Sequence, residues 1–185
     1  MYSEDREDEL PQGTNPIVIN SYQLNGFDLR SLWKGISIHN WNENISLYYN
    51  DGEVMLDYVP NNLSWLIFSD EAVRIIEKVA TEAEVFKVSI SSETSKDKKQ
   101  ANVVNILTSI SAMNWEKSDY ASWDDEPKDI KVIRNLVINS SAIVNKPDVF
   151  RLEESKNFII VSEKFKQEVE RNNLKGFGFW EIDIV

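Results

Sequence analysis

Two similar stretches of sequence place the strongest constraint on the fold. Each has a short apolar run, then a serine, then acidic or polar residues: Ile67-Phe68-Ser69-Asp70-Glu71 and Ile160-Val161-Ser162-Glu163-Lys164. A serine hydroxyl can accept a hydrogen bond from a free backbone N–H in the first turn of a helix, and carboxylates favour the positive end of the helix dipole. Apolar residues then recur at helical spacing; they are Ala72, Ile75, Ile76, Val79 and Ala80 in the first stretch and Phe165 and Val169 in the second. We therefore predict a strand followed by a capped helix twice.

Most of the other apolar segments alternate with polar residues or are rich in β-branched residues, which is typical of strands. The further predicted strands are Ile17–Ile19, a loop and strand within Ser31–Trp41, Ile45–Tyr49, Val54–Val59, Val85–Ile90, Ala101–Met113, Ile130–Ile138 and Ile182–Val185. Asn50-Asp51-Gly52 predicts a hairpin between residues 45–49 and 54–59, because Asp-Gly tolerates the positive φ of a tight turn. Residues 91–100 and 114–129 are predicted to be polar loops, and Gly176 to favour the end of the second helix.

These patterns predict an α+β fold with a mainly antiparallel sheet and two clear helices. The repeated strand–serine–helix unit fits two similar halves packed as one domain, or a chance recurrence, since capped helices often follow strands. Residues 1–15 lack hydrophobic periodicity, and we expect them to form a flexible acidic arm. Residues 16–185 are expected to form a single globular domain.

Composition excludes several kinds of chemistry. The 185 residues include no cysteine and one histidine, His39, which excludes disulfides, thiolate metal sites and clusters of histidine ligands. No apolar stretch is long enough to cross a bilayer, and the N-terminus is acidic, unlike a signal peptide. We therefore expect a soluble, cytoplasmic protein. His39 itself is predicted to be a hydrogen-bonded histidine in an aromatic environment.

The net charge of −11 is unevenly distributed along the chain. Residues 1–90 hold 15 acidic and 6 basic side chains, a net charge of −9, whereas residues 91–185 hold 16 and 14, a net charge of −2. A negative field repels phosphate backbones, so direct nucleic-acid binding is disfavoured. It accelerates encounters with a basic partner, although the charge also serves solubility alone.

The segment before residue 130 combines aromatic and acidic side chains. We predict an interaction surface there, because aromatic anchors dominate interface energies and neighbouring charges select partners. The candidate residues are Trp115, Tyr120, Trp123, Asp124, Asp125 and Glu126. The alternative is that the aromatic rings fold back over the core. Residues 124–126 lack the ligand spacing of a calcium loop, so no metal site is predicted, and we expect no cofactor.

No catalytic motif stands out elsewhere. There is no G-x-S-x-G elbow, Walker A, H-E-x-x-H or kinase signature. Gly176-Phe177-Gly178 follows a predicted helix and precedes a strand, which is the opposite order from a phosphate-binding loop. An enzyme with a carboxylate site hidden among the 31 acidic residues stays open as an alternative.

Three stretches resemble a family of bacterial immunity proteins that are encoded beside polymorphic toxins, immunity family eleven. The first is residues 66–73, the second residues 102–118, and the third joins Val149-Phe150-Arg151-Leu152, residues 159–166 and residues 174–179. The resemblance extends from about Ile17 to Ile182. It departs from the family pattern at Met113-Asn114-Trp115, where an aspartate-containing turn is expected.

The resemblance implies a non-enzymatic inhibitor that binds a cognate toxin. The lack of an export signal implies a toxin that acts in the cytosol. On this interpretation the acidic N-terminal half and the loop from Trp115 to Glu126 meet a basic toxin surface and block its site. The alternatives are an enzyme of unknown reaction and a structural subunit of a larger assembly.

Overall fold

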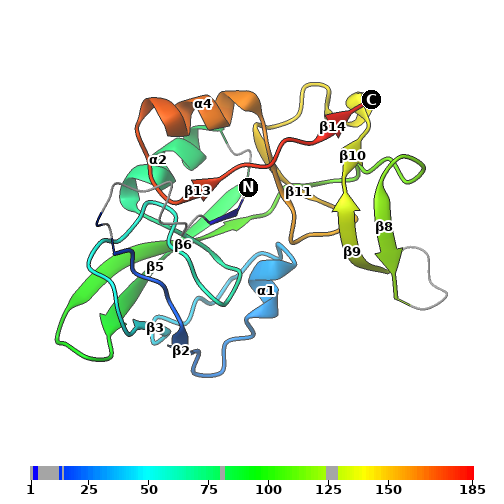
Figure 1. Cartoon of the computed structure of the whole chain (residues 1–185). Coiled ribbons are helices and arrows are strands. Elements are labelled where there is room, and N and C mark those ends of the chain that lie inside the picture. The colour runs from blue at the N-terminus through cyan, green and yellow to red at the C-terminus, as the bar shows by residue number, and fades with distance from the viewer. Residues whose placement is uncertain (1, 4–12, 14, 80–81, 124–128) are drawn as a thin grey trace.

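The computed structural model describes residues 2–3, 13, 15–79, 82–123 and 129–185. Within them the chain has an α+β fold with mixed, largely antiparallel sheets, as predicted (Figure 1). The largest sheet has the order β2-β3-β5-β6-β4 and only its β3–β5 pair is parallel. Its strands are β2 (Ser21–Gln23), β3 (Ser46–Tyr49), β4 (Leu66–Phe68), β5 (Ala83–Ser92) and β6 (Lys98–Ile106).

Four smaller sheets surround this one. The three-stranded sheet has the order β12-β11-β7, from β12 (Ile159–Val161), β11 (Val149–Leu152) and β7 (Ser109–Ile110). Antiparallel pairs join β8 (Asp119–Ser122) to β9 (Ile130–Asn135) and β1 (Tyr2–Ser3) to β13 (Phe177–Gly178). The last pair, β10 (Val137–Ile138) and β14 (Asp183–Ile184), is parallel. Figure 1 shows the β8–β9 hairpin standing apart from the large sheet, at the right of the view.

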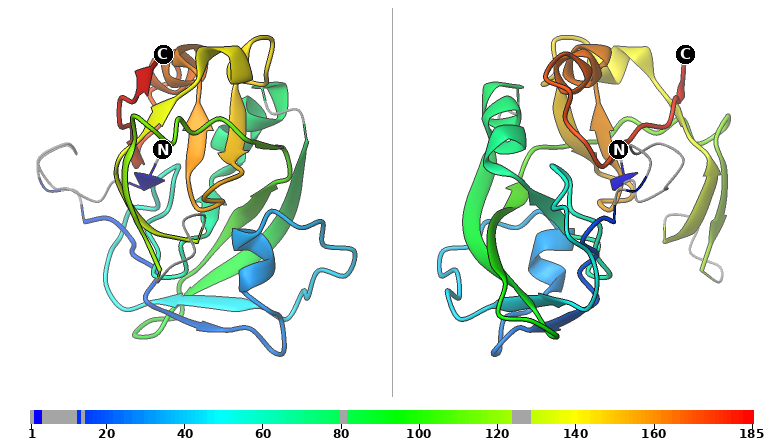
Figure 2. Two further views of the ribbon diagram at one scale, coloured as in Figure 1. Left: turned by 90° about the vertical axis from the view of Figure 1, so that its right-hand side faces the viewer. Right: turned by 60° about the vertical axis from the view of Figure 1, so that its left-hand side comes forward.

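Both predicted helices are present, α2 (Asp70–Val79) and α4 (Glu163–Arg171). Two short ones accompany them, α1 (Arg30–Trp33) and α3 (Ser140–Ile143). The longer helices lie side by side over one part of the molecule, as Figures 1 and 2 show. Their apolar faces meet in one cluster, in which Phe165 and Phe68 are fully buried.

The two strand–serine–helix units share the same cap geometry. Ser69 Oγ accepts from Ala72 N at 3.2 Å and donates to Asp57 at 2.6 Å. Ser162 Oγ accepts from Phe165 N at 3.2 Å and donates to Asp148 at 2.7 Å. In both units the serine N–H also donates to the backbone carbonyl of that aspartate. The sequence similarity therefore corresponds to a repeated local structure, and each serine both caps a helix and ties it to a neighbouring segment.

The predicted hairpin of residues 45–49 and 54–59 is wrong. The β3 strand pairs with β2 and β5 instead, while Val54 bridges Pro16 in parallel and Tyr58 bridges Phe68. Gly52 does have a positive φ, of 111°, but a Cβ there would lie 2.5 Å from Pro16 O. The Asp-Gly signal thus identified a left-handed glycine, and the segment that follows it packs against residues 15–19.

Other boundaries also differ from the predictions. Strands β5 and β6 cover half of residues 91–100, so the loop is limited to the residues between Ser92 and Lys98. The long predicted strand from Ala101 ends at Ile106 and resumes as β7. A helical turn, α1, begins the segment predicted to be loop and strand, and its aromatic residues Trp33 and Trp41 do pack against the core. Within the predicted polar loop 114–129, four residues form β8.

The helix termination assigned to Gly176 is also wrong. Helix α4 ends at Arg171, and the left-handed residue after it is Asn173, with φ of 54°. Leu174 N then donates to Val169 O at 3.1 Å, which closes the last turn. Gly176 has φ of 88° for another reason, because it passes against the backbone of Tyr58.

One buried cation links three parts of the fold. Arg151, on β11, is 4% exposed and donates to three carbonyls: Leu32 O of α1 at 2.9 Å, Ile106 O at 2.7 Å and Lys156 O at 2.7 Å. No carboxylate within the described ranges pairs with it. Burial lowers the pKa of Arg151 to about 10, so the side chain is still charged at neutral pH. This guanidinium fixes α1 against the two main sheets.

Most of the predicted arm, residues 1–15, lies outside the described residues. Of it, Tyr2–Ser3 form β1, and Asn15 O accepts from Glu53 N and Val54 N. None of the helices within the described ranges is long and apolar enough to span a membrane.

Candidate functional site

The predicted aromatic residues lie on the β8–β9 hairpin and in the turn before it. Trp115 and Tyr120 are half-buried and form an edge-to-face pair with ring centroids 5.3 Å apart. Both pack against a separate hydrophobic cluster, which includes Met113 and Phe150. These two aromatic rings therefore anchor the inner face of the hairpin to the core, and Ile133, opposite Tyr120 in the register, packs on the same cluster.

Trp123 has a different environment. It follows β8, its side chain is 53% exposed, and its backbone N–H donates to Asp129 O at 2.8 Å. The Lys131 ammonium lies 4.4 Å from the centre of its ring, a cation–π contact that orients the indole. Val132, opposite Ala121, is 43% exposed on the same hairpin. The outer part of the hairpin thus presents an indole and an aliphatic side chain to solvent.

The acidic side chains of this region are only partly described. Asp124, Asp125 and Glu126 lie outside the described residues. Asp119, at the base of the hairpin, forms a two-point ion pair with Arg134, with Nε–Oδ2 at 2.9 Å. The Arg134 hydrogen bond lowers the pKa of Asp119, so this carboxylate is ionised and already neutralised by its partner. An exposed ion pair therefore joins the two strands at the base of the hairpin.

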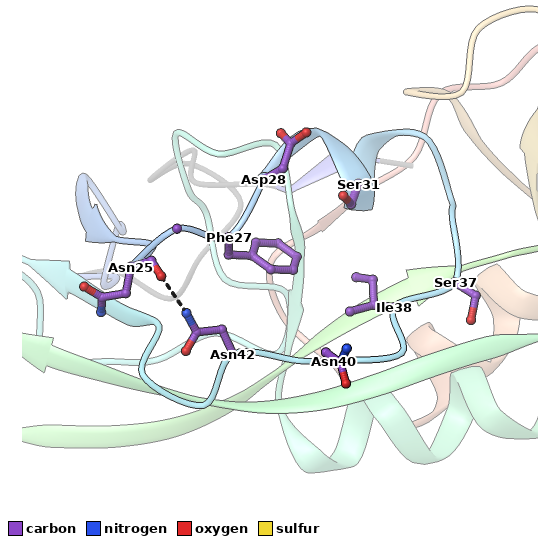
Figure 3. A pocket seen from close by; sticks show the side chains of 9 residues that line it. Asn25, Phe27, Asp28, Ser31, Ser37, Ile38, Asn40 and Asn42 are labelled. Atoms are coloured by element: carbon purple, nitrogen blue, oxygen red, sulfur yellow. Dashed lines mark hydrogen bonds between the residues drawn. The ribbon is translucent and has the colours of Figure 1, made fainter.

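A polar pocket opens beside α1, in residues that the sequence analysis did not single out. Its volume is about 390 Å³, and its lining comes from residues 25–28, Ser31, Ser37, Ile38, Asn40 and Asn42. Figure 3 shows Phe27 and Ile38 facing one another across it, with Ser31 on one side and Asn40 on the other. Phe27 also contacts Trp41 edge-to-face at 5.2 Å. The pocket thus combines an apolar interior surface with polar groups at its rim.

The walls of this pocket are held by hydrogen bonds between distant segments. Asn42 Nδ2 donates to Asn25 O at 2.9 Å, and Asn25 Nδ2 donates to Asn44 O at 2.7 Å. Asn25 and Gly26 both have positive φ, which the Asn-Gly pair adopts readily. An Asn-Gly pair followed by Asn40-Trp41-Asn42 is a signal that could have been read from the sequence as a turn with polar loop residues.

A second pocket, of about 440 Å³, lies at the turn after β3. It is acidic, with Asp51, Glu53 and Asp97 in its lining. Asp97 accepts from Tyr49 Oη at 2.8 Å and pairs with Lys99 at 2.9 Å, contacts that lower the pKa of the Asp97 carboxyl. Asp51 and Glu53 are exposed, and neither carboxylate has a partner within the described residues.

The histidine prediction is wrong in its details. His39 is exposed, and its ring makes no hydrogen bond within the part of the chain that the structure describes. Its charge acts on Glu84. Burial opposes ionisation of Glu84, but hydrogen bonds from Ser37, Ile38 N and Asn105, aided by His39, hold the pKa of this carboxyl below its usual range. Glu84 therefore fastens the 37–39 segment to β5.

A metal centre has no support in the described residues, because they contain no group of three or more histidine, cysteine, aspartate or glutamate side chains that could hold an ion. What the geometry offers is surface for another molecule: an exposed indole on an anchored hairpin, a polar pocket and an acidic turn.

Comparison with known proteins identifies the family. The family model described as "Immunity protein family (Imm11)" matches residues 3–183, nearly the whole chain. No curated protein matches the sequence. The matched region contains the Arg151 strand, both serine caps and the β8–β9 hairpin. The chain therefore belongs to the Imm11 immunity protein family, a family of generally non-enzymatic proteins.

Proposed function

We propose that this protein binds a cognate toxin that acts in the cytosol and neutralises it by covering the toxin's functional surface, with no chemical step of its own. The observation that carries the proposal is Trp123, half-exposed on a hairpin whose inner aromatic residues are anchored in the core. A large exposed indole costs little conformational entropy to immobilise and buries much area on contact. Because β8 pairs with β9 just before Trp123 and Lys131 contacts its ring, less free energy is lost on binding.

Electrostatic attraction is the second element of the proposal. The N-terminal half carries the larger share of the net charge, and Asp51 and Glu53 stand exposed without partners. A basic toxin surface would be steered toward this side of the molecule. The carboxylates of residues 124–126 remain predicted contacts beside Trp123.

Co-expression tests the function itself. The toxin domain encoded beside this gene is expressed in the cytosol, without an export signal, with and without this protein. We expect growth rescue and co-purification of the two chains in a stable complex. Lack of rescue, turnover of a substrate by the purified chain alone, or a stable assembly that contains no toxin would contradict the proposal.

The Trp123→Ala variant tests the hairpin. Loss of a central aromatic anchor typically costs about 2 kcal/mol of binding free energy, so we expect Kd for the toxin to rise about 30-fold, mainly through faster dissociation. Isothermal titration calorimetry or surface plasmon resonance measures the change. The matched control is Trp180→Ala, since Trp180 is 76% exposed on a different segment. Equal weakening by both variants, or none by Trp123→Ala, would count against the hairpin.

The Asp51→Asn/Glu53→Gln double variant tests the steering. We expect the association rate of the wild-type protein to fall about 10-fold between low and high salt, and the variant to have a lower rate at low salt and a shallower salt dependence. The control removes two exposed carboxylates elsewhere, Glu170→Gln/Glu181→Gln. An association rate that barely changes with ionic strength would exclude electrostatic steering.

A further inference from the structure

We propose that the pocket beside α1 is a second contact point for the toxin, and that it receives a neutral side chain that both donates and accepts hydrogen bonds, a carboxamide of asparagine or glutamine. This inference rests on the proposed function and adds a recognition site to it. None of the residues in its lining belongs to the β8–β9 hairpin; they come from α1 and the loops on either side of it.

The charge of the pocket argues for a neutral occupant. Asp28 is the one charged residue in its lining, and Arg30 already holds both of its oxygens, with Nε–Oδ1 at 3.0 Å and Nη2–Oδ2 at 3.2 Å. That pairing lowers the pKa of Asp28 and leaves no free counter-charge for a lysine or arginine. The nearby carboxylate of Glu84 already accepts hydrogen bonds from Ser37, Ile38 N and Asn105. An incoming ion would lose hydration without gaining a partner.

The free hydrogen-bonding groups define the chemistry of the occupant. Asn25, Ser37 and Asn42 use their side chains within the protein. The Asn40 amide and the Ser31 hydroxyl have no hydrogen-bond partner among the described residues. Each can donate and accept. A carboxamide offers one carbonyl oxygen and two N–H groups, so it complements groups that both donate and accept.

The apolar surface of the pocket suits the same occupant. Phe27 and Ile38 pack against the buried cluster that includes Leu32 and Trp65, and their outer faces line the pocket. The Phe27 ring is fixed by edge contacts to Trp41 at 5.2 Å and Trp65 at 5.9 Å. The methylene groups of a glutamine or asparagine can lie against these two side chains.

The test measures binding of the neighbouring toxin domain to pocket variants. We expect Asn40→Ala and Ser31→Ala each to raise Kd about 5-fold, as for one neutral hydrogen bond, and Asn40→Trp, which fills the opening, about 100-fold. Dissociation should accelerate while the salt dependence of association stays unchanged. Hydrogen exchange of residues 25–42 should slow on binding. The matched control is Asn44→Ala, an exposed asparagine outside the pocket lining.

The outcomes separate this inference from the proposed function. If the wild-type protein binds the toxin and all the pocket variants bind equally well, the pocket proposal is overturned and the function stands. If Asn44→Ala weakens binding as much as Asn40→Ala, the pocket is again not the cause. A wild-type protein that binds no toxin overturns both. On the toxin, replacing the asparagine or glutamine of the segment protected from exchange should reproduce the loss seen with Asn40→Ala.

Discussion

Arg151→Met is expected to lower the free energy of unfolding by about 3 kcal/mol, because it strands three carbonyls, two in buried and one in a part-buried hydrogen bond, that now share one guanidinium. These are the carbonyls of Leu32, Ile106 and Lys156, with hydrogen bonds of 2.7–2.9 Å. Methionine fills much of the volume but donates nothing. The variant also no longer carries the cost of burying a charge. The expected loss of stability is therefore smaller than the sum for three lost hydrogen bonds. Urea unfolding followed by circular dichroism measures the change.

Two further substitutions separate the role of the guanidinium fork from that of the charge. Arg151→Lys keeps the charge, but an ammonium on a flexible stem cannot span three carbonyls in fixed directions, so we expect most of the loss to remain. Arg134→Met removes an exposed arginine paired with Asp119 and should change stability by less than about 0.5 kcal/mol. A stability equal to wild type for Arg151→Met would show that the three carbonyls find water or other donors.

The position of Arg151 also links stability to the pocket. Its hydrogen bond to Leu32 O holds α1, which carries Ser31. A Cβ on Gly35, just after α1, would lie 2.8 Å from the Arg151 side chain, so the chain there passes directly over the guanidinium. Loosening α1 would therefore displace one wall of the pocket as well as weaken the fold.

The helices were predictable from sequence because their signals are local. A serine cap, acidic residues and apolar spacing all lie within one or two turns of chain, and α2 and α4 begin directly after Ser69 and Ser162. The strand partners were not predictable in this way. Gly52 has the positive φ that the Asp-Gly pair predicted, yet β3 pairs with β2 and β5, because pairing depends on which distant segments bury the same face.

The candidate site was predictable only as a region. Trp115, Tyr120 and Trp123 lie in one polar stretch, and nothing local separates an anchoring ring from an exposed one. The difference comes from β8, which directs Tyr120 toward the core, and from the register shift after Ala121 that precedes Trp123. The pocket beside α1 was missed because Asn42 and Asn25 join segments whose approach depends on the tertiary fold.

Gly176→Ala is expected to lower the free energy of unfolding by about 3 kcal/mol, because the added side chain overpacks a close contact between two backbones. The role of this glycine is therefore to allow that contact, and not to end a helix. Its backbone lies against that of Tyr58: Tyr58 N donates to Lys175 O at 3.0 Å, and Lys175 N donates to Asp57 at 2.9 Å. An added Cβ would stand 2.3 Å from Tyr58 O and 3.0 Å from the Leu56 side chain, so the clamped backbones must separate. The aspartate in this clamp also holds Ser69, so the shift would reach the cap of α2.

Gly26→Ala provides the matched control that isolates this close approach. Gly26 has φ of 89° against 88° for Gly176, and a Cβ there meets nothing within 4 Å. It should therefore show only the cost of a left-handed alanine, about 1 kcal/mol. Chemical unfolding of both variants gives the comparison directly. Equal losses would mean that φ alone explains the glycine. A loss about 2 kcal/mol larger for Gly176→Ala would show that the contact between residues 175–176 and 57–58, which joins the C-terminal segment to the large sheet, requires a residue without a side chain.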